Sequence, residues 1–168
     1  MNVKNILFLL LVLFTVISLT QCMCPSQCSC NAKSVHCSEG TLKNIPHFLN
    51  PDIDTLDLAN NNIVKLESGL TFYTELTLVN ISRNLLKSLG RNQFMNQNKV
   101  IDLDISSNLV SKIRVGAFHG LESLHTLNLK DNKIKKIGAA VFTGKNSNKL
   151  KHCSIVSPPY FTKQNIKI

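Results

Sequence analysis

Residues 53–63 read IDTLDLANNNI, and their pattern returns in LTLVNISRNLL at 76–86, VIDLDISSNLV at 100–110 and LHTLNLKDNKI at 124–134. In each stretch the first, fourth, sixth and eleventh residues are apolar and the ninth is asparagine. The asparagines are separated by 23, 24 and 24 residues. A pattern that recurs at a fixed spacing of this kind indicates structural repeats that stack on one another and share a core.

Each column of the repeat has a physical role of its own. The fourth and sixth residues alternate with more exposed ones, which predicts a short β-strand with one buried face. Asparagine can both donate to and accept from backbone groups, so stacked asparagines are expected to form a ladder of hydrogen bonds. The phenylalanines that follow ten or eleven residues later are expected to close the opposite side of each coil: Phe72, Phe94, Phe118 and Phe142.

Together these columns resemble the leucine-rich repeat, in the form of roughly 24 residues found in animal extracellular proteins. The resemblance implies an α/β-class solenoid: a right-handed coil with a parallel sheet on its concave side and irregular or 3₁₀ turns on its convex side. It extends to Slit-like, Toll-like, peroxidasin-type and small matrix proteoglycan ectodomains without choosing among them. The expected repeats are 53–75, 76–99, 100–123 and 124–147.

The N-terminus has the composition of a secretory signal peptide. Lys4 precedes residues 6–19, an uncharged run that is too short to cross a bilayer, since a membrane-spanning helix needs about 20 apolar residues. Cleavage is expected before Met23, so that residues 1–22 are removed, with cleavage before Gln21 or an uncleaved signal anchor as alternatives. We therefore expect a mature chain without a transmembrane segment, secreted to the extracellular space or matrix.

Four cysteines lie close together ahead of the repeats: Cys24, Cys28, Cys30 and Cys37. In an oxidising compartment such a cluster favours two disulfides over a zinc site. Three pairings are possible, and Cys28 and Cys30 are too close to pair comfortably, which favours a crossed arrangement. In the resembled family these residues form an N-terminal cap, here 23–52, whose usual pairing implies Cys24–Cys30 and Cys28–Cys37.

The C-terminal end departs from the family pattern. Leu150, Cys153 and Ile155 fit a fifth strand, but Pro158 falls at the asparagine position and cannot donate a hydrogen bond. The usual second cysteine cap is missing, so residues 148–168 are expected to form a degenerate fifth repeat or tail. Because Cys22 leaves with the signal peptide, Cys153 is expected to be unpaired, either as a small buried residue or as a free thiol.

Strand residues that point away from the core are expected to line the concave face. Five acidic and two basic residues fall at such positions, so this face is mildly acidic in a chain of formal charge +9. Leu78 and Ile101 are its exposed apolar residues and the expected contact anchors. The predicted face comprises Asp54, Asp57, Leu78, Asn80, Arg83, Ile101, Asp102, Asp104, His125, Asn128 and Lys130.

Asn80-Ile81-Ser82 is the one N-x-S/T sequence in the chain, which makes Asn80 a candidate for N-glycosylation. It falls at the centre of the concave face. A glycan there would block that face, so either the site is unused or binding moves to an edge.

A second surface is basic. Lysines recur between the apolar residues that follow each asparagine, which places them on one flank of the coils: Lys43, Lys65, Lys87, Lys112, Lys135 and Lys136. A regular ladder of cations suits a repeating polyanion such as a heparan-sulfate-like glycan, although a solvated flank is the simpler interpretation.

Catalytic motifs are missing from the sequence. Its five histidines have no metal-ligand spacing, Gly144-Lys145 lacks the upstream glycine of a phosphate loop, and no Gly-x-Ser-x-Gly occurs. The chain is therefore expected not to be an enzyme and to have no catalytic, cofactor-binding or metal-binding residues. With two tyrosines and no tryptophan to stack bases, nucleic acid is not an expected partner either.

We therefore expect a module that binds an extracellular protein or matrix ligand through the solenoid surface. The alternatives are a truncated ectodomain of a receptor or adhesion protein, the N-terminal module of a peroxidasin-like multidomain enzyme, and glycosaminoglycan binding through the lysine flank.

Overall fold

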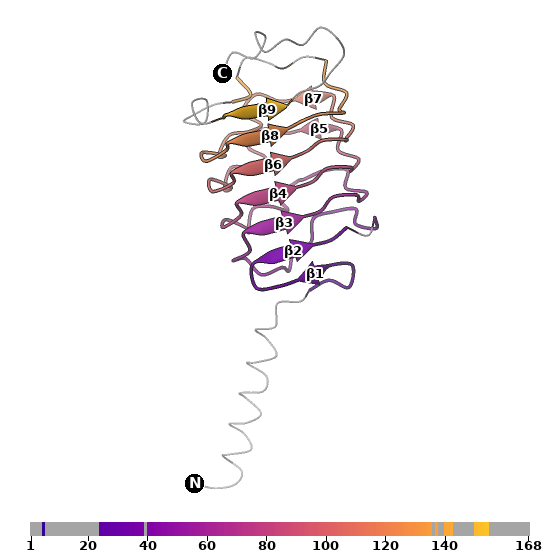
Figure 1. The fold of residues 1–168 in the computed structure, drawn as a ribbon, viewed down its shortest axis with the longest axis vertical. Helices are drawn as coiled ribbons and strands as arrows, with labels where there is room; N and C mark the ends of the chain where they lie inside the picture. Colours follow the sequence, from indigo (N-terminus) through magenta and orange to yellow (C-terminus); the bar gives the residue numbers. More distant parts are fainter. Residues whose placement is uncertain are drawn as a thin grey trace.

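The computed structural model describes Asn5 and residues 24–38, 40–135, 137, 140–142 and 150–154. Over these residues the chain winds into stacked coils, with its strands side by side along one face (Figure 1). In this described part, the main sheet has the order β1-β2-β3-β4-β6-β8-β9. Its strands are β1 (Ser29–Cys30), β2 (Ser34–His36), β3 (Thr55–Asp57), β4 (Leu78–Asn80), β6 (Asp102–Asp104), β8 (Thr126–Asn128) and β9 (His152–Ser154).

The register of the sheet follows the repeat. β1 and β2 form an antiparallel hairpin, and from β2 onward each strand pairs in parallel with the next one. Leu56 lies opposite Val79, and Leu103 opposite Leu127, so the fourth residues of the repeats form one continuous row. Since equal repeat lengths bring equivalent residues to the same height, the predicted parallel sheet is confirmed.

The segments that connect one strand of the main sheet to the next are irregular, as the resemblance implied. β5 (Ser88–Leu89) pairs in parallel with β7 (Lys112–Ile113) in a separate small sheet, which lies behind the main one in Figure 1. Turns make up most of the remaining path between consecutive strands of the main sheet. The solenoid is therefore a β-solenoid with little helix.

The asparagine ladder forms as the sequence predicts. Asn84 donates from Nδ2 to the carbonyl oxygens of Leu58 and Ile81, and its Oδ1 accepts from the amide of Ile63. Asn108 makes the equivalent contacts one coil later, and the other two ladder asparagines do the same. Each side chain therefore satisfies backbone groups of neighbouring coils that would otherwise be buried without partners.

The phenylalanine column is only partly as predicted. Phe94, Phe118 and Phe142 stack in sequence, with ring centroids 6.2 and 5.0 Å apart. Phe72, however, is 63% exposed, so its assignment to the core is wrong. Leu70 takes the place of the phenylalanine in the first coil.

The difference follows from the length of the first repeat. Its ladder spacing is 23 residues instead of 24, and the missing residue lies before the aromatic position. The turn bond from the Tyr73 amide to the Leu70 carbonyl is the equivalent of the bond from Gln97 to Phe94. Tyr73 is accordingly 1% exposed and packs inward, whereas the sequence pattern predicts that Phe72 does so.

The cysteine cluster forms a cap that continues the solenoid. The disulfides are Cys24–Cys30 and Cys28–Cys37, as the family pattern implied. Val35 and Cys37 are buried at the positions that leucines occupy in the repeats, and the amide of Cys37 bonds to the carbonyl of Asp57. The cap is thus a modified coil that covers the apolar end of the first repeat.

The last described strand also matches its prediction. β9 adds to β8 in parallel, with Cys153 opposite Leu127 at the inward position. Leu150 and Cys153 pack against the core cluster. Ile155, Pro158 and the rest of the tail lie outside the described residues, as do Cys22, the signal-peptide residues other than Asn5, and Lys136.

Candidate binding surface

The outward residues of the main sheet form two rows on either side of the buried central row. One row contains Leu78, Asp102 and Thr126, which lie opposite one another on β4, β6 and β8. The other contains Asp57, Asn80, Asp104 and Asn128. The topology therefore brings together most of the residues that the sequence assigned to the concave face.

A shallow hollow lies between these rows. It has a volume of about 290 Å³ and is lined by side chains from β4, β6 and β8, including Leu78, Asn80, Asp102 and Thr126. Leu78 and Ile101 are each 41% exposed, which is high for large aliphatic residues. Ile101 immediately precedes β6, and its amide bonds to the carbonyl of Thr77, next to Leu78. The two predicted anchors are therefore diagonal neighbours beside the hollow.

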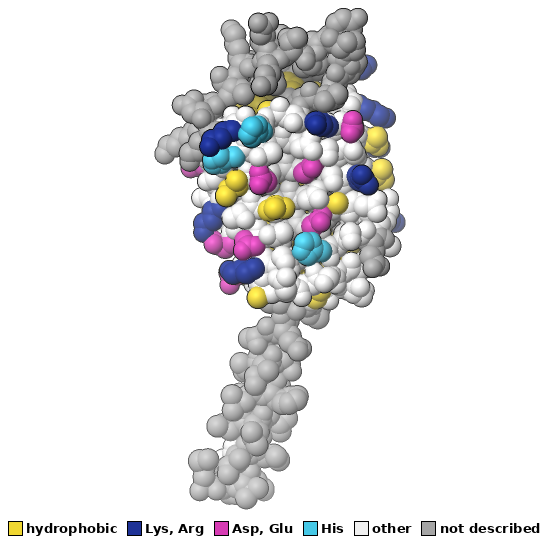
Figure 2. All heavy atoms as spheres, in the orientation of Figure 1, with side chains coloured by type: hydrophobic (Ala, Val, Ile, Leu, Met, Phe, Trp, Pro, Cys, Tyr) yellow, Lys and Arg dark blue, Asp and Glu magenta, His cyan; other side chains and the backbone are white. Residues whose placement is uncertain are grey.

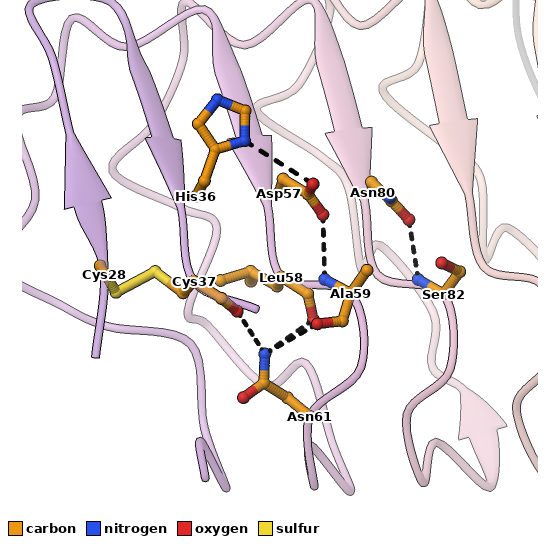
Figure 3. A network of polar contacts seen from close by, with 9 residues as sticks. All are labelled: Cys28, His36, Cys37, Asp57, Leu58, Ala59, Asn61, Asn80 and Ser82. Carbon is orange, nitrogen blue, oxygen red and sulfur yellow. Dashed lines mark hydrogen bonds and ion pairs between the residues drawn. A yellow bond between two sulfur atoms is a disulfide. The ribbon is translucent and has the colours of Figure 1, made fainter. Parts of the chain in front are cut away.

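The second row also has a structural role. Each member accepts a hydrogen bond at Oδ1 from the backbone amide two residues later and so holds the turn at the end of its strand. Asp57 binds Ala59 and Asn80 binds Ser82, both at 3.0 Å (Figure 3), and Asp104 binds Ser106 at 2.7 Å. The position therefore selects Asp or Asn because of their short side chains.

The remaining oxygens of this row are also engaged. Asp57 Oδ2 lies 3.7 Å from His36 Nδ1, across the boundary between the cap and the first repeat (Figure 3). Asp104 Oδ2 accepts from Asn128 Nδ2 at 2.9 Å. These carboxylates are therefore partly committed to neighbours within the sheet.

Asp102 differs from these carboxylates. It is exposed, and among the described residues its side chain makes no hydrogen bond or ion pair. Asp54, at the edge of the face, accepts from the hydroxyl of Thr55. Asp102, between Leu78 and Thr126, is thus the carboxylate of the hollow that is most available to a ligand.

The remaining predicted residues lie around the hollow rather than in it. His125 precedes β8, and its Nδ1 is 2.6 Å from the carbonyl oxygen of Ser123. Arg83 and Lys130 are exposed on the turns that follow β4 and β8. Figure 2 shows the resulting pattern: acidic and apolar side chains lie over the middle of the strand face, with most Lys and Arg side chains toward its borders.

The lysine flank is exposed throughout its described part. Lys43, Lys65, Lys87, Lys112 and Lys135 all present their side chains to solvent. Lys112 belongs to β7, and Lys87 directly precedes β5, so these two lie along the small second sheet. Lys65 lies 3.7 Å from Glu67, the one acidic contact of these lysines within the described residues.

The sequence interpretation missed one residue of this surface and left a second one out of the predicted binding face. His36 faces outward from the cap strand, and Thr126 lines the hollow. His36 could have been found by extending the repeat backward, since residues 32–42 place Val35 and Cys37 at the fourth and sixth positions. Thr126 follows from the sequence as an exposed strand position between buried leucines, but the predicted binding face does not include it.

Cys153 is the described cysteine without a disulfide. Burial raises the pKa of its thiol to about 11. A thiol with such a pKa is almost entirely protonated at neutral pH and reacts slowly.

Within the described ranges, no three His, Cys, Asp or Glu side chains are grouped so as to hold a metal ion. Among the same residues, no helix has the length and apolar character that a membrane crossing requires.

Known proteins resemble this chain in the sequence of its repeats and in its coiled fold. The leucine rich repeat family model matches residues 74–134 and 98–150. Human oligodendrocyte-myelin glycoprotein is 39% identical over 90 residues, which cover 51% of this chain and 20% of that protein. Pig biglycan is 43% identical over 68 residues, which cover 37% of this chain and 25% of biglycan. The matches thus span a quarter or less of these relatives, neither of which is named as an enzyme.

The crystal structure of human 5T4, also called trophoblast glycoprotein, has the same architecture. It superposes with a TM-score of 0.70 over 80% of this chain and 54% of that chain, at 23% sequence identity. At this identity the likeness concerns the fold. Together with the four repeat columns, the ladder and the capped coils, this superposition shows that the chain has the leucine-rich-repeat fold with a disulfide-bonded N-terminal cap.

Proposed function

We propose that this chain is a secreted binding module that recognises an extracellular protein ligand through its concave face. The observation that carries the proposal is the hollow over β4, β6 and β8. Exposed Leu78 lines it together with Asp102, whose carboxylate has no partner among the described residues, and exposed Ile101 lies beside it. Interfaces concentrate their binding energy in a few such central residues, and a rigid sheet presents them at little cost in conformational entropy.

The chemistry of the hollow favours a ligand that presents an arginine or a lysine. The aliphatic stem of such a side chain can lie against Leu78 and Ile101, while its charged head meets Asp102. Arginine is also enriched at the centres of protein interfaces. The ligand's contact segment is therefore proposed to be basic.

Secretion is supported by the N-terminal apolar run and by the disulfide-bonded cap. Disulfides persist in oxidising compartments and are rare in the cytosol. The proposed organisation is a signal peptide at 1–22, a cap at 23–52, repeats over 53–147 and a degenerate fifth repeat or tail at 148–168. Binding then requires no chemistry from the chain, which acts through surface complementarity.

Site-directed photocrosslinking tests this proposal. A photoreactive residue is placed at position 101 of the secreted chain or, as a control, at position 115, since Val115 is also exposed but lies beyond β7. Both proteins are incubated with cells and extracellular matrix. The expected result is a protein adduct at position 101 that is lost when Asp102→Lys is added, and none at position 115. Equal crosslinking at both positions would contradict the proposal.

A second function, binding of a sulfated glycan, is favoured by the uniform exposure of the lysine flank. Five lysines face solvent on successive coils, and a repeating polyanion could contact several of them at once. Changing Lys65, Lys87, Lys112 and Lys135 to glutamine is expected to lower the salt concentration that elutes the chain from heparin.

The control changes the same number of charges elsewhere, at Lys33, Lys99, Lys130 and Lys151. If both quadruple variants elute at the same salt concentration, net charge explains retention, and the flank has no specific role.

A further inference from the structure

The sequon at Asn80 lies inside the proposed binding surface. Asn80 ends β4 with its side chain on the outward face and forms part of the lining of the hollow together with Leu78, Asp102 and Asp104. A modification of its side chain would therefore occupy the space in which a ligand is proposed to bind.

The fold leaves the reactive amide nitrogen of Asn80 available. Oδ1 accepts from the Ser82 amide at 3.0 Å, as Figure 3 shows, but among the described residues Nδ2 donates no hydrogen bond. The equivalent nitrogen of Asn128 donates to Asp104, and that of Asn84 is buried and bonded to backbone carbonyls. Asn80 thus differs from its neighbours in the row and in the ladder.

The other essential group of the sequon is also free. Ser82 takes part in the fold through its backbone, whose amide binds Asn80 and whose carbonyl accepts from Asn60 and Asn84. No hydrogen bond of its hydroxyl occurs among the described residues. A glycan on Asn80 would consequently break no interaction of the folded chain.

We infer that Asn80 carries an N-linked glycan on part of the secreted chains, and that this glycan closes the concave hollow of those chains to protein ligands. The co-reactant is an oligosaccharide linked to a lipid diphosphate. Asn80 Nδ2 forms a bond to the anomeric carbon of the first N-acetylglucosamine and loses one proton, while the bond from that carbon to the diphosphate oxygen breaks and the lipid diphosphate leaves. This inference rests on the proposed function, since it requires passage through the secretory pathway.

Occupancy would then divide the secreted chain into two forms. In the glycosylated form the first sugar stands at the lining of a hollow of about 290 Å³, beside Leu78 and Asp102. In the unmodified form these side chains remain accessible. Glycosylation therefore regulates which molecules can use the concave face, and the lysine flank stays open in both forms.

Occupancy is measured on the full chain expressed in secretory animal cells. Intact mass before and after enzymatic removal of N-glycans reports the modification, and Ser82→Ala supplies a glycan-free form that keeps Asn80 and its turn. The expected result is a wild type that is secreted in two forms, with one glycan and with none, and a Ser82→Ala variant that carries none, with both chains recovered from the medium. The variant Asn80→Gln gives a second glycan-free form in case Ser82→Ala is poorly secreted.

Closure of the hollow is measured without any ligand. In a Cys153→Ser background, Leu78→Cys places a thiol in the hollow and Val115→Cys places one beyond β7. A bulky polyethylene-glycol maleimide is expected to label Leu78→Cys about tenfold more slowly when the glycan is present, a barrier higher by about 1.4 kcal/mol. Labelling of Val115→Cys should be unaffected.

Each outcome has a distinct meaning. A wild type that reaches the medium entirely without the glycan, or a glycosylated chain with unchanged labelling at position 78, overturns the inference and leaves the proposed protein binding intact. A chain that never reaches the medium overturns the proposed function and, with it, this inference.

Discussion

The hydroxyl of Tyr73 donates a hydrogen bond to the carbonyl oxygen of Pro46, and this bond joins the first repeat to the cap. The hydroxyl oxygen of Tyr73 in turn accepts a hydrogen bond from the amide of Leu49 at 3.4 Å. Burial raises the pKa of Tyr73, while the bond from Leu49 acts in the opposite direction. Tyr73 therefore supplies hydrogen-bond partners to two backbone groups of the cap, the Pro46 carbonyl and the Leu49 amide.

Replacement of this tyrosine should destabilise the cap junction. In Tyr73→Phe, the Pro46 carbonyl and the Leu49 amide lose their partner, and leaving buried polar groups unsatisfied costs about 1–3 kcal/mol. Tyr73→Ala also removes the buried ring, for which losses of about 3–5 kcal/mol are typical. The free energy of unfolding from chemical denaturation is the measurement.

The neighbouring residue is the matched control. Phe72→Ala removes an aromatic ring one position earlier, but that ring is exposed, and surface substitutions usually change stability by no more than about 0.5 kcal/mol. If Phe72→Ala proved as damaging as Tyr73→Ala, the register described for the first coil would be wrong.

This pair also shows what the sequence could predict and what it could not. Columns whose spacing is constant, such as Leu103 and Asn108, were placed correctly because each repeat reproduces the same packing. The aromatic column was misplaced in one coil because a single-residue deletion before it moves Tyr73 inward and Phe72 outward. The amino-acid sequence alone does not show where within a repeat the missing residue lies.

The candidate binding surface likewise has features that the sequence predicts and features that only the structure reveals. Outward positions such as Leu78 and Asp102 follow from the two-residue alternation of a strand, so the sequence could name them. It could not show that Asp104 is engaged by Asn128, or that Asp102 is not, because such pairing depends on side-chain directions between adjacent strands. That Asp102 has no side-chain partner among the described residues is therefore a structural finding.

The asparagine ladder should be intolerant of truncation. Asn108 is buried and bonds to three carbonyl oxygens and one amide of neighbouring chain segments. Because each buried polar group without a partner costs about 1–3 kcal/mol, Asn108→Ala is expected to lose at least about 3 kcal/mol of unfolding free energy. Asn98→Ala, at an exposed position, is the control and should be close to neutral. Similar losses in both variants would show that the ladder bonds add no net stability.

A glycine on the convex side should be equally sensitive for a steric reason. Gly120 has a φ of +99°, and a Cβ there would lie 2.3 Å from the carbonyl oxygen of Phe94. Since that contact is with backbone in the adjacent coil, no side-chain rotation relieves it. Gly120→Ala is expected to lower the melting temperature, by an amount equivalent to about 1–3 kcal/mol or more.

Gly90→Ala makes the same substitution at a position where the added Cβ meets a side chain and no backbone atom. Its Cβ would meet the end of the Gln93 side chain at 3.1 Å, which can move away. A small effect at position 90 with a large one at position 120 is the expected contrast. Equal losses of stability at the two positions would contradict the local clash with the Phe94 carbonyl as the cause.

The thiol of Cys153 should make stability fall at alkaline pH. Burial at the inward position of β9 raises the pKa of the thiol from its ordinary value of 9.0 to about 11, so the folded state holds a proton that the unfolded state releases first. Its contribution to stability is therefore complete below about pH 9 and is lost as the pH rises toward and beyond about 11.

Cys153→Ala removes this titration and keeps a small apolar side chain at the position. Melting temperatures recorded from about pH 8 to about pH 11 are expected to fall more steeply for the wild type than for this variant, while the lysines and tyrosines that titrate in both chains cancel in the comparison. The raised pKa of Tyr73 adds a decline above its ordinary value of 10.0, and that decline is common to both. Parallel curves would mean that the thiolate is solvated in the folded chain, and that β9 does not bury Cys153 against the last coil.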